Sequence, residues 1–268
     1  MRDDLINILR SEQTTQGILR LTMDDQQNRN ALSEVMMKNL FEQLTRAASD
    51  RSIRVIIIAS NGPVFSAGHD LKEITAARNQ RNPGDTYFKS LFDTCSSLMQ
   101  LIVNCPKPVI AEVGGAATAA GCQLVASCDL ATASESAQFA TPGVNIGLFC
   151  STPMVALSRN VHKKSAMEML LTGDMITAEK AKEIGLINNY FKPENLTNET
   201  MILANKIAGK SSVTVSMGKS AFYTQSELDL SAAYEYTSKV MVKNIHKEDA
   251  KEGIDAFIEK RSPKWVDK

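Results

Sequence analysis

The chain has 268 residues, of which 43% are hydrophobic and 22% carry a charge. A chain of this length can bury a large core and needs no disulfides or structural metals to fold. Thirty lysine and arginine residues balance thirty aspartate and glutamate residues, so the formal net charge is zero. This balance argues against a bulk electrostatic attraction to nucleic acid.

The cysteine pattern and the first residues of the sequence indicate in which cellular compartment the protein is expected. No C-x-x-C pair occurs among the five cysteines, which favours reduced thiols over a disulfide framework or a zinc site. The opening MRDDLINILR resembles neither a secretory signal nor a transit segment. No run reaches the roughly 18 uninterrupted apolar residues of a membrane span. We expect a soluble protein without a membrane partner, cytoplasmic if bacterial and mitochondrial, after processing, if eukaryotic.

In the first third of the chain, apolar runs alternate with turns. Leu5–Arg10 and Gly17–Met23 flank the polar segment SEQTTQ and are expected to form a hairpin. Asn30 is expected to cap a helix, because apolar side chains recur at helical spacing behind it. Val55–Ala59 is a continuous apolar run, typical of a strand covered on both faces. The segment Asn79–Asp85 contains proline and glycine and is expected to be a mobile loop.

The middle of the chain continues this alternation. Apolar positions at helical spacing predict a helix over residues 88–102, and Val109–Val113 follows as a second buried strand. A short helix is expected to begin near Ala120. Cys128–Ala133 is expected to be a third strand. This order of strands and helices implies right-handed crossovers and an α/β class.

The last third is dominated by helical periodicity. After about Ser158, one strand is expected near Ile187–Phe191, and the chain from Lys206 onward carries no strand signal. We therefore predict an α/β core over residues 1–200 and a helical C-terminal region over residues 201–268.

Two segments rich in small residues could carry chemistry. In PVFSAGHDLKE, residues 63–73, Gly68 allows a tight turn that exposes successive backbone N–H groups. In GGAATAAGCQLVASCD, residues 114–129, a helix beginning near Ala120 would direct free N–H groups at an approaching group. An ordinary turn and tight helix packing also explain each segment taken alone.

Motifs of several other enzyme classes do not occur in the sequence. The glycines of residues 114–121 do not fit G-x-G-x-x-G, and there is no phosphate-binding P-loop. There is no G-x-S-x-G nucleophile elbow. The three histidines form no metal-ligand pattern, so no metal is expected.

Together, the two segments resemble the paired oxyanion-hole motifs of the enoyl-CoA hydratase/isomerase family, the crotonases. The resemblance extends over nearly the whole chain, through NRNALSEVMMKNL, LTGDMITAEKAKEIGLIN and EGIDAFIEKRSPKW. GHDLKE, AAGCQLVASCD and FATPGVNIGLFCSTP further resemble one branch of this family. The resemblance implies a crotonase-type spiral of ββα units with a helical C-terminal region, assembled as a homotrimer or a dimer of trimers.

The resemblance also implies a site for an acyl-CoA thioester. The backbone N–H groups of His69 and Ala120 would hold the thioester carbonyl oxygen and stabilise the negative charge of an enolate. CoA would enter as part of the substrate, without a separate cofactor. The His69 side chain could reach this site, although a packed or solvated imidazole is the simpler interpretation. The further substrate-binding positions implied are Ala67, Asp70, Leu71, Lys72, Gly121, Gly143, Phe257 and Lys260.

Some of these substrate positions have plain alternatives. Lys72 could meet a CoA phosphate as a point charge, or could simply be solvated. Phe257 and Lys260 match residues that relatives use to cover CoA, sometimes from a neighbouring subunit. Phe257 could equally belong to a helix core.

The carboxylates that a water-adding member of the family uses are missing. One falls at Gln123, whose amide can orient water but cannot accept a proton, and the other falls at Gly143. Ser151 stands where dienoyl isomerases have an acid, and Cys150 has no visible base to activate it as a nucleophile. Because a general base contributes about 10²–10⁴ in rate, efficient hydration of a simple enoyl-CoA is not expected.

Two functions fit these residues. The first is an acyl-CoA enzyme of lyase or isomerase type, in fatty acid metabolism, that stabilises an enolate without the hydratase pair, for example in a decarboxylation. The second is a non-catalytic acyl-CoA-binding or assembly subunit. Nucleic-acid binding, known for one branch of the family, is the weakest hypothesis because the sequence has no net positive charge.

Overall fold

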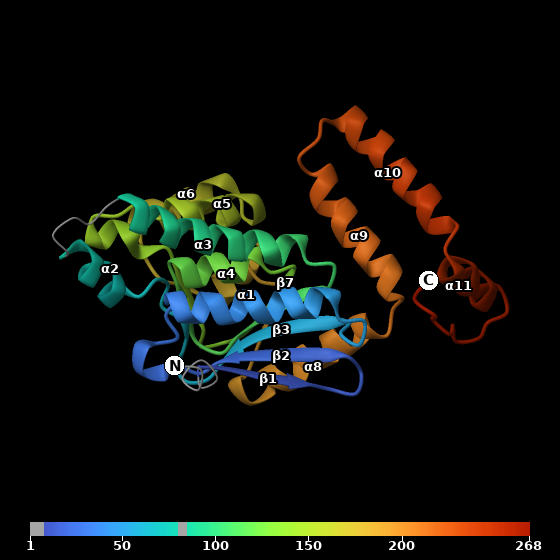
Figure 1. Ribbon diagram of the computed structural model, residues 1–268, viewed down its shortest axis with the longest axis horizontal. Helices are drawn as coiled ribbons and strands as arrows, with labels where there is room; N and C mark the ends of the chain where they lie inside the picture. The colour runs from blue at the N-terminus through green and yellow to red at the C-terminus, as the bar shows by residue number, and fades with distance from the viewer. Residues whose placement is uncertain (1–7, 80–84) are drawn as a thin grey trace.

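Two β-sheets form the framework of the protein (Figure 1). This computed structural model describes residues 8–79 and 85–268. Within these ranges the larger sheet has six strands, in the order β1 (Leu9–Gln13), β2 (Ile18–Met23), β3 (Val55–Ser60), β5 (Val109–Val113), β7 (Leu130–Ser134) and β10 (Asn189–Phe191). The pair β1–β2 is antiparallel, and the other neighbouring strands are parallel.

A smaller sheet lies beside it. Its described strands are, in order, β4 (Val64–Ser66), β6 (Ala116–Thr118), β8 (Gln138–Ala140) and β9 (Ile176–Thr177). The strands β3, β5 and β7 of the larger sheet are each followed by one strand of the smaller sheet and then by a helix or a 3₁₀ turn. This repeated unit confirms the predicted α/β class and the spiral of ββα units.

Helices cover both faces of the larger sheet (Figure 1). The helices within the described ranges are α1 (Glu34–Ser49), α2 (Leu71–Arg78), α3 (Asp85–Asn104), α4 (Ala120–Ser127), α5 (Ser151–Asn160), α6 (Lys163–Thr172), α7 (Ala178–Glu183), α8 (Pro193–Ala208), α9 (Ser212–Gln225), α10 (Leu230–Ile245) and α11 (Glu248–Ile258), with 3₁₀ helices η2 (Gln26–Asn28) and η3 (Pro142–Ile146). In these ranges no helix combines the length and the apolar character that crossing a bilayer requires.

Strand β3 shows how the two faces are filled. Ile56 and Ile58 belong to the core that includes residues of α1 and α3, whereas Val55, Ile57 and Ala59 pack with residues of α8. Successive side chains of a strand point to opposite faces, so a strand covered on both sides is apolar throughout. The predicted buried strand is therefore confirmed.

The predicted cap of the first long helix is wrong. Helix α1 begins at Glu34, and the side chain of Ser33 accepts the Met36 N–H at 3.2 Å. Asn30 instead lies in the left-handed region, with φ 49°, which asparagine tolerates better than most residues. Its buried side chain accepts the N–H of Asp25 and donates to two backbone carbonyls, at Asn61 and Val64. The Asn30 side chain thus stabilises the loop before α1, and the helix starts about one turn after the predicted cap.

Other boundaries differ by a few residues. The hairpin is confirmed, but β1 continues to Gln13, so the first half of SEQTTQ is strand and the turn closes with the Gly17 N–H on the Thr14 carbonyl. Most of the predicted loop Asn79–Asp85 lies outside the described residues, with Asn79 at the end of α2 and Asp85 at the start of α3. The first residues of the predicted run Leu5–Arg10 also lie outside them. The strands of the smaller sheet were not predicted, because two or three residues show no periodicity.

The C-terminal helices α9, α10 and α11 extend away from the sheets (Figure 1). Helix α8 crosses the predicted boundary at residue 200, but it packs against the larger sheet. Helix α10 has no buried residue. The helices that leave the core therefore begin at α9.

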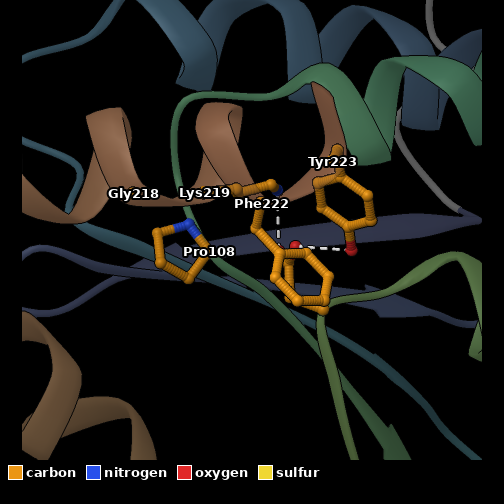
Figure 2. A pocket seen from close by; sticks show the side chains of 6 residues that line it. Pro108, Gly218, Lys219, Phe222 and Tyr223 are labelled. Carbon is orange, nitrogen blue, oxygen red and sulfur yellow. Dashed lines mark hydrogen bonds and ion pairs between the residues drawn. The ribbon is translucent and has the colours of Figure 1, made fainter. Parts of the chain in front are cut away.

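A largely buried ion pair joins α9 to the core (Figure 2). The Lys219 ammonium donates to the Asp129 carboxylate at 2.7 Å and to two backbone carbonyls, those of Ile102 and Lys107. The Tyr223 hydroxyl donates to the other oxygen of Asp129 at 3.0 Å. Burial, and then the carboxylate beside it, raise the pKa of Tyr223. These contacts fix one face of α9 against the segment before β5 and the segment before β7.

Candidate active site

The first candidate segment forms a turn between β4 and α2. Gly68 has φ 89°, a conformation that a residue with a side chain adopts only with strain. The Asp70 carboxylate caps α2 by accepting the Lys72 N–H at 2.7 Å. The predicted turn with Gly68 at its centre is present, and the Asp70 side chain is engaged in capping the helix.

The second candidate segment leads from β6 into α4. Ala119 has φ 51° although it is not glycine, and its N–H donates to the Ala140 carbonyl of β8 at 3.0 Å. Helix α4 begins at Ala120, as predicted, and all of its residues are buried. The first N–H groups of a helix have no acceptor within the helix, so the N–H of Ala120 is available to another group.

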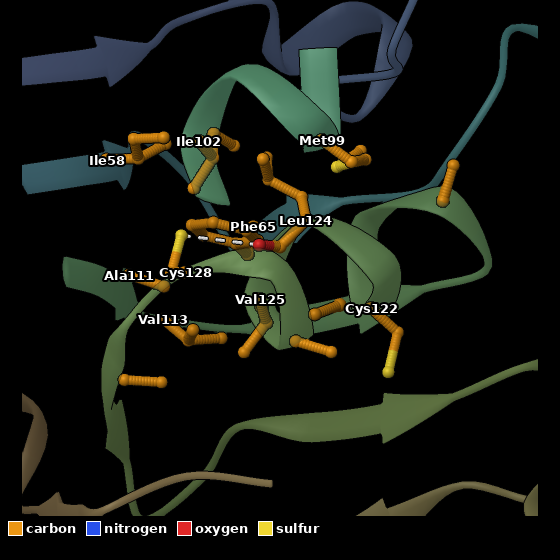
Figure 3. Packing of buried hydrophobic residues seen from close by; sticks show 14 of the residues in the cluster. Ile58, Phe65, Met99, Ile102, Ala111, Val113, Cys122, Leu124, Val125 and Cys128 are labelled. Atoms are coloured by element: carbon orange, nitrogen blue, oxygen red, sulfur yellow. Dashed lines mark hydrogen bonds between the residues drawn. The ribbon is translucent and has the colours of Figure 1, made fainter. Parts of the chain in front are cut away.

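Helix α4 is held firmly in the core (Figure 3). Leu124 and Val125 lie among Phe65, Met99 and Val113, and all five side chains are buried. A strained backbone conformation persists only where the surrounding structure determines it, and this packing supplies that constraint for the Ala119–Ala120 corner.

The two turns pack directly against each other. A Cβ atom placed on Gly68 would lie 2.9 Å from the Cβ of Ala119 and 3.0 Å from the nitrogen of Ala120. A Cβ atom on Gly121 would collide with the Ser66 carbonyl oxygen. The Thr118 hydroxyl also donates to the Ala67 carbonyl at 3.1 Å. The structure therefore brings residues 66–68 and 118–121 together, and both glycines are required by this close approach.

The backbone around His69 runs beside Leu32, which lies just before α1. The Leu32 N–H donates to the Gly68 carbonyl at 2.7 Å, and Leu32 forms an isolated parallel bridge with His69. In such a bridge the peptide groups on either side of the central residue pair with the partner strand. The N–H of His69 itself consequently points to the opposite side from Leu32.

The imidazole of His69 lies against α3. Its ring meets Phe92 edge to face, with centroids 5.4 Å apart and an interplanar angle of 83°. Both ring nitrogens are buried, and neither has a hydrogen-bond partner among the described residues. Burial lowers the pKa of His69 below its ordinary value of 6.5; the Leu32 backbone, near the ring but outside hydrogen-bond geometry, opposes the shift. The imidazole is therefore neutral at pH 7.

Gln123 contacts the same side of α3 as the His69 ring does. Its side chain is 4% exposed, and the Cys95 thiol lies 3.9 Å from its carbonyl oxygen, a weak hydrogen bond. Burial raises the pKa of Cys95 to about 12, so this thiol stays protonated. A groove of about 1050 Å³ extends from Gln123 between α3, α5 and α9 and includes Met99 and Val155 in its wall.

Gly143 lies in η3 and is buried. A Cβ atom there would lie 2.7 Å from the Leu148 carbonyl oxygen and 2.9 Å from the Cys150 sulfur. Since backbone atoms cannot yield as a flexible side chain does, no carboxylate side chain fits at this position without a shift of the chain. The family resemblance implies a glutamate at this position, and the structure shows that the space for such a side chain is filled.

The two remaining polar candidates beside η3 have local partners. The Cys150 sulfur accepts the Gly143 N–H at 3.3 Å, and burial, only partly offset by this bond, raises the pKa of the thiol. A thiol with a raised pKa is a poor nucleophile, which agrees with the expectation for Cys150. Ser151 is exposed at the start of α5, and its hydroxyl donates to the Phe149 carbonyl at 3.4 Å.

The predicted CoA-binding positions fall into two groups. Leu71 and Lys72 are exposed beside the first turn, and the Lys72 ammonium donates to the side-chain oxygen of Asn28 at 2.9 Å. Phe257 is 85% exposed on α11, and Lys260 follows that helix. In Figure 1, α11 and α2 lie at opposite ends of the protein. Within one chain Phe257 and Lys260 therefore do not meet the first turn, and their role stays a prediction that requires a neighbouring subunit.

Sequence patterns did not single out Phe92 and Cys95 as residues of the site. Both belong to the apolar pattern of α3, and their contacts to His69 and Gln123 join residues more than 20 positions apart. Only their spacing, three residues on one helix, indicates that they share a face.

Comparison with known proteins covers almost the whole chain. The model of the family described as enoyl-CoA hydratase/isomerase matches residues 13–268. A relative from Rattus norvegicus, named enoyl-CoA hydratase domain-containing protein 3, mitochondrial, is 49% identical over 257 residues, which cover 96% of this chain and 84% of the relative.

Solved structures agree with this assignment. The crystal structure of human enoyl Coenzyme A hydratase domain-containing protein 3 matches with a TM-score of 0.91 at 48% identity, covering 96% of this chain and 100% of that chain. An enoyl-CoA hydratase from Mycobacterium smegmatis matches with a TM-score of 0.92 at 45% identity, covering 96% and 98%. The branch that the sequence resembles is that of the rat and human relatives, which confirms the prediction. The chain belongs to the enoyl-CoA hydratase/isomerase family.

Proposed function

We propose that this protein binds an acyl-CoA thioester and stabilises its enolate with the backbone N–H groups of His69 and Ala120. The observation that carries the proposal is the direct packing of the two turns, where a Cβ atom on Gly68 would lie 3.0 Å from the Ala120 nitrogen. The names of the relatives contain enoyl-CoA hydratase, which supports a CoA thioester as the substrate class.

The chemistry follows from where charge develops. When a proton or carbon dioxide leaves the α-carbon of a thioester, the electron pair left behind moves onto the carbonyl oxygen. Fixed N–H donors stabilise that oxygen without having to reorganise, and loss of one such donor typically costs about 10²–10³ in rate. The N-terminus of α4 adds the positive end of its helix dipole.

The same residues argue against hydration. A glutamine amide at position 123 cannot take a proton from water, and position 143 has no space for a second carboxylate. The reaction we propose is therefore of the lyase or isomerase type in fatty acid metabolism, in which the enolate forms without the pair of glutamates. A decarboxylation meets this condition, because loss of carbon dioxide generates the enolate without a strong base.

The absence of both glutamates also favours a second candidate function, a non-catalytic subunit that binds acyl-CoA. Titration calorimetry with acetyl-, butyryl-, octanoyl- and malonyl-CoA, combined with mass-spectrometric detection of products and of α-deuterium in D₂O, separates the two. We expect binding together with either a product or α-deuteration. Binding with neither would establish the second function, and failure of every ester to bind would contradict both.

The exposed apolar surface of the C-terminal helices supports assembly. Large apolar side chains more than half exposed on α9, α10 and α11 or at their ends are Phe222, Leu230, Tyr234, Met241, Val242, Ile245, Phe257 and Ile258. Large exposed apolar side chains in such number commonly mark an interface between proteins. We propose a homotrimer or a dimer of trimers, as the sequence resemblance implies. Light scattering should give three or six times the chain mass, and a monomer across the concentration range would contradict this.

A further inference from the structure

The imidazole of His69 is a polar side chain at this site that the proposed function leaves unused. Its two ring nitrogens are buried and have no hydrogen-bond partner among the described residues. Buried polar atoms in native proteins are nearly always paired, and an exception calls for a ligand, a water or a catalytic role. An ordinary packed histidine would bond at least one nitrogen to a backbone or side-chain group.

The position of the ring relates it to the proposed oxyanion hole. The ring belongs to the same residue as the N–H that would hold the thioester oxygen, which limits its distance from the proposed site. The ring packs on Phe92 of α3, and Gln123 packs on Cys95, three residues further along the same helix. Three residues of an α-helix correspond to a rise of about 4.5 Å.

The residues of α3 that contact the imidazole and Gln123 are therefore about one helical turn apart. At position 123 the family resemblance implies a glutamate, and a neutral imidazole is a group that can accept a proton. We propose, on the basis of the proposed function, that the imidazole of His69 is the proton-transfer group of this site.

The proposed proton transfer needs only the bound thioester, the His69 ring and the two backbone N–H groups. One ring nitrogen of neutral His69 takes a proton from the α-carbon of the bound thioester. The C–H bond breaks, its electron pair forms the C=C bond of the enolate, and the carbonyl electrons move to the oxygen held by the two backbone N–H groups. Return of the proton, or of one exchanged with solvent, regenerates the thioester and neutral imidazole.

The surroundings of the ring favour its neutral form. Among the described residues it packs on uncharged groups, the Phe92 ring and the backbone at Leu32. Titratable groups on adjoining elements are engaged elsewhere or uncharged. The Asp70 carboxylate accepts the Lys72 N–H at the start of α2, and Asp93 of α3 pairs with Lys89. The Cys95 thiol stays protonated. The folded protein binds fewer protons at His69 than the unfolded chain does, so the free base persists below pH 6.5.

Exchange of the α-hydrogens of butyryl-CoA in D₂O, followed by NMR from pH 4.5 to 9, tests this proposal. We expect the wild-type rate to rise with pH through a pKa below 6.5 and then to level off, because only the free base accepts a proton. His69→Ala keeps the backbone N–H and removes only the imidazole. We expect the exchange rate to fall by about 10²–10⁴ while calorimetry shows unchanged binding of butyryl-CoA.

Two further variants make the test specific. His69→Gln keeps the size and polarity of the side chain without a base and should lose exchange to the same extent; added imidazole should restore part of the rate in His69→Ala. His162→Ala, which removes an exposed histidine, should leave exchange unchanged. Wild-type exchange rates in both His69 variants, or no exchange in wild-type protein that binds the ester, would overturn the role of His69 and leave the binding function intact. No binding by the wild type would overturn both.

Discussion

Replacing Gly68 by alanine is expected to lower the rate of α-hydrogen exchange in bound acyl-CoA by about 10²–10³, the cost of losing one donor to an oxyanion. Alanine is strained at φ 89°, and its Cβ would lie 2.9 Å from that of Ala119 and 3.0 Å from the Ala120 nitrogen. The two turns must move apart to relieve this contact, which would separate the N–H groups of His69 and Ala120 that we propose hold one oxygen.

Gly114→Ala is the matched control for Gly68→Ala. A Cβ atom on Gly114 meets nothing within 4 Å, and this glycine is not in the left-handed region. We expect Gly114→Ala to exchange α-hydrogens at the wild-type rate. Circular dichroism and thermal melting establish that both variants are folded. An unchanged rate in folded Gly68→Ala would mean that the contact between the turns does not control catalysis.

Replacing Lys219 by methionine is expected to lower the free energy of unfolding by about 3–5 kcal/mol, the usual cost of breaking a buried ion pair by removing one partner. The Lys219 side chain is 7% exposed and that of Asp129 is 16% exposed. Removing the ammonium leaves the largely buried Asp129 carboxylate with the Tyr223 hydroxyl and the Val109 N–H as its remaining partners. Urea denaturation at a fixed protein concentration measures the change.

An exposed lysine provides the control for Lys219→Met. Lys239 pairs with Glu235 four residues earlier on α10, and their side chains are 69% and 71% exposed. Solvent screens such a pair, so Lys239→Met should leave the unfolding curve unchanged. Hydrogen exchange should increase in α9 of Lys219→Met before it increases in α1. If the two lysine variants are equally stable, the ion pair does not anchor α9.

The sequence predicts those elements that are long and apolar. Val55–Ala59 is an uninterrupted apolar run, and α3 repeats apolar residues at helical spacing over twenty positions. Patterns of this length identify a strand and a helix from the sequence alone. Strands such as β4 and β6 have three residues each and are defined by their pairing with each other, which is a property of the fold. The spiral of ββα units was expected only from the family resemblance.

The site was predictable where the backbone carries the chemistry. A turn with Gly68 and a helix beginning at Ala120 follow from local residue types, and the structure contains both. Contacts between distant segments did not follow. The Leu148 carbonyl that fills the space beside Gly143 and the packing of His69 on Phe92 depend on how separate elements meet.

Asn30 illustrates a local prediction that the fold overrides. Asparagine is a good helix cap, and a helix does follow. Here Asn30 has φ 49°, and its side chain is engaged in three hydrogen bonds to residues 25, 61 and 64, while Ser33 caps the helix. Only the tertiary contacts of Asn30 show that its side chain is not available to cap the helix.

The infrared stretch of the thioester carbonyl in [1-¹³C]butyryl-CoA tests the pairing of the two backbone amides on one oxygen most directly. Two fixed donors polarise the carbonyl more strongly than water does, so the stretch of the bound ester should fall below its frequency in solution. In Gly68→Ala it should return toward the solution value. A bound carbonyl that vibrates as it does in water, in wild-type protein saturated with ester, would contradict the oxyanion hole formed by His69 and Ala120.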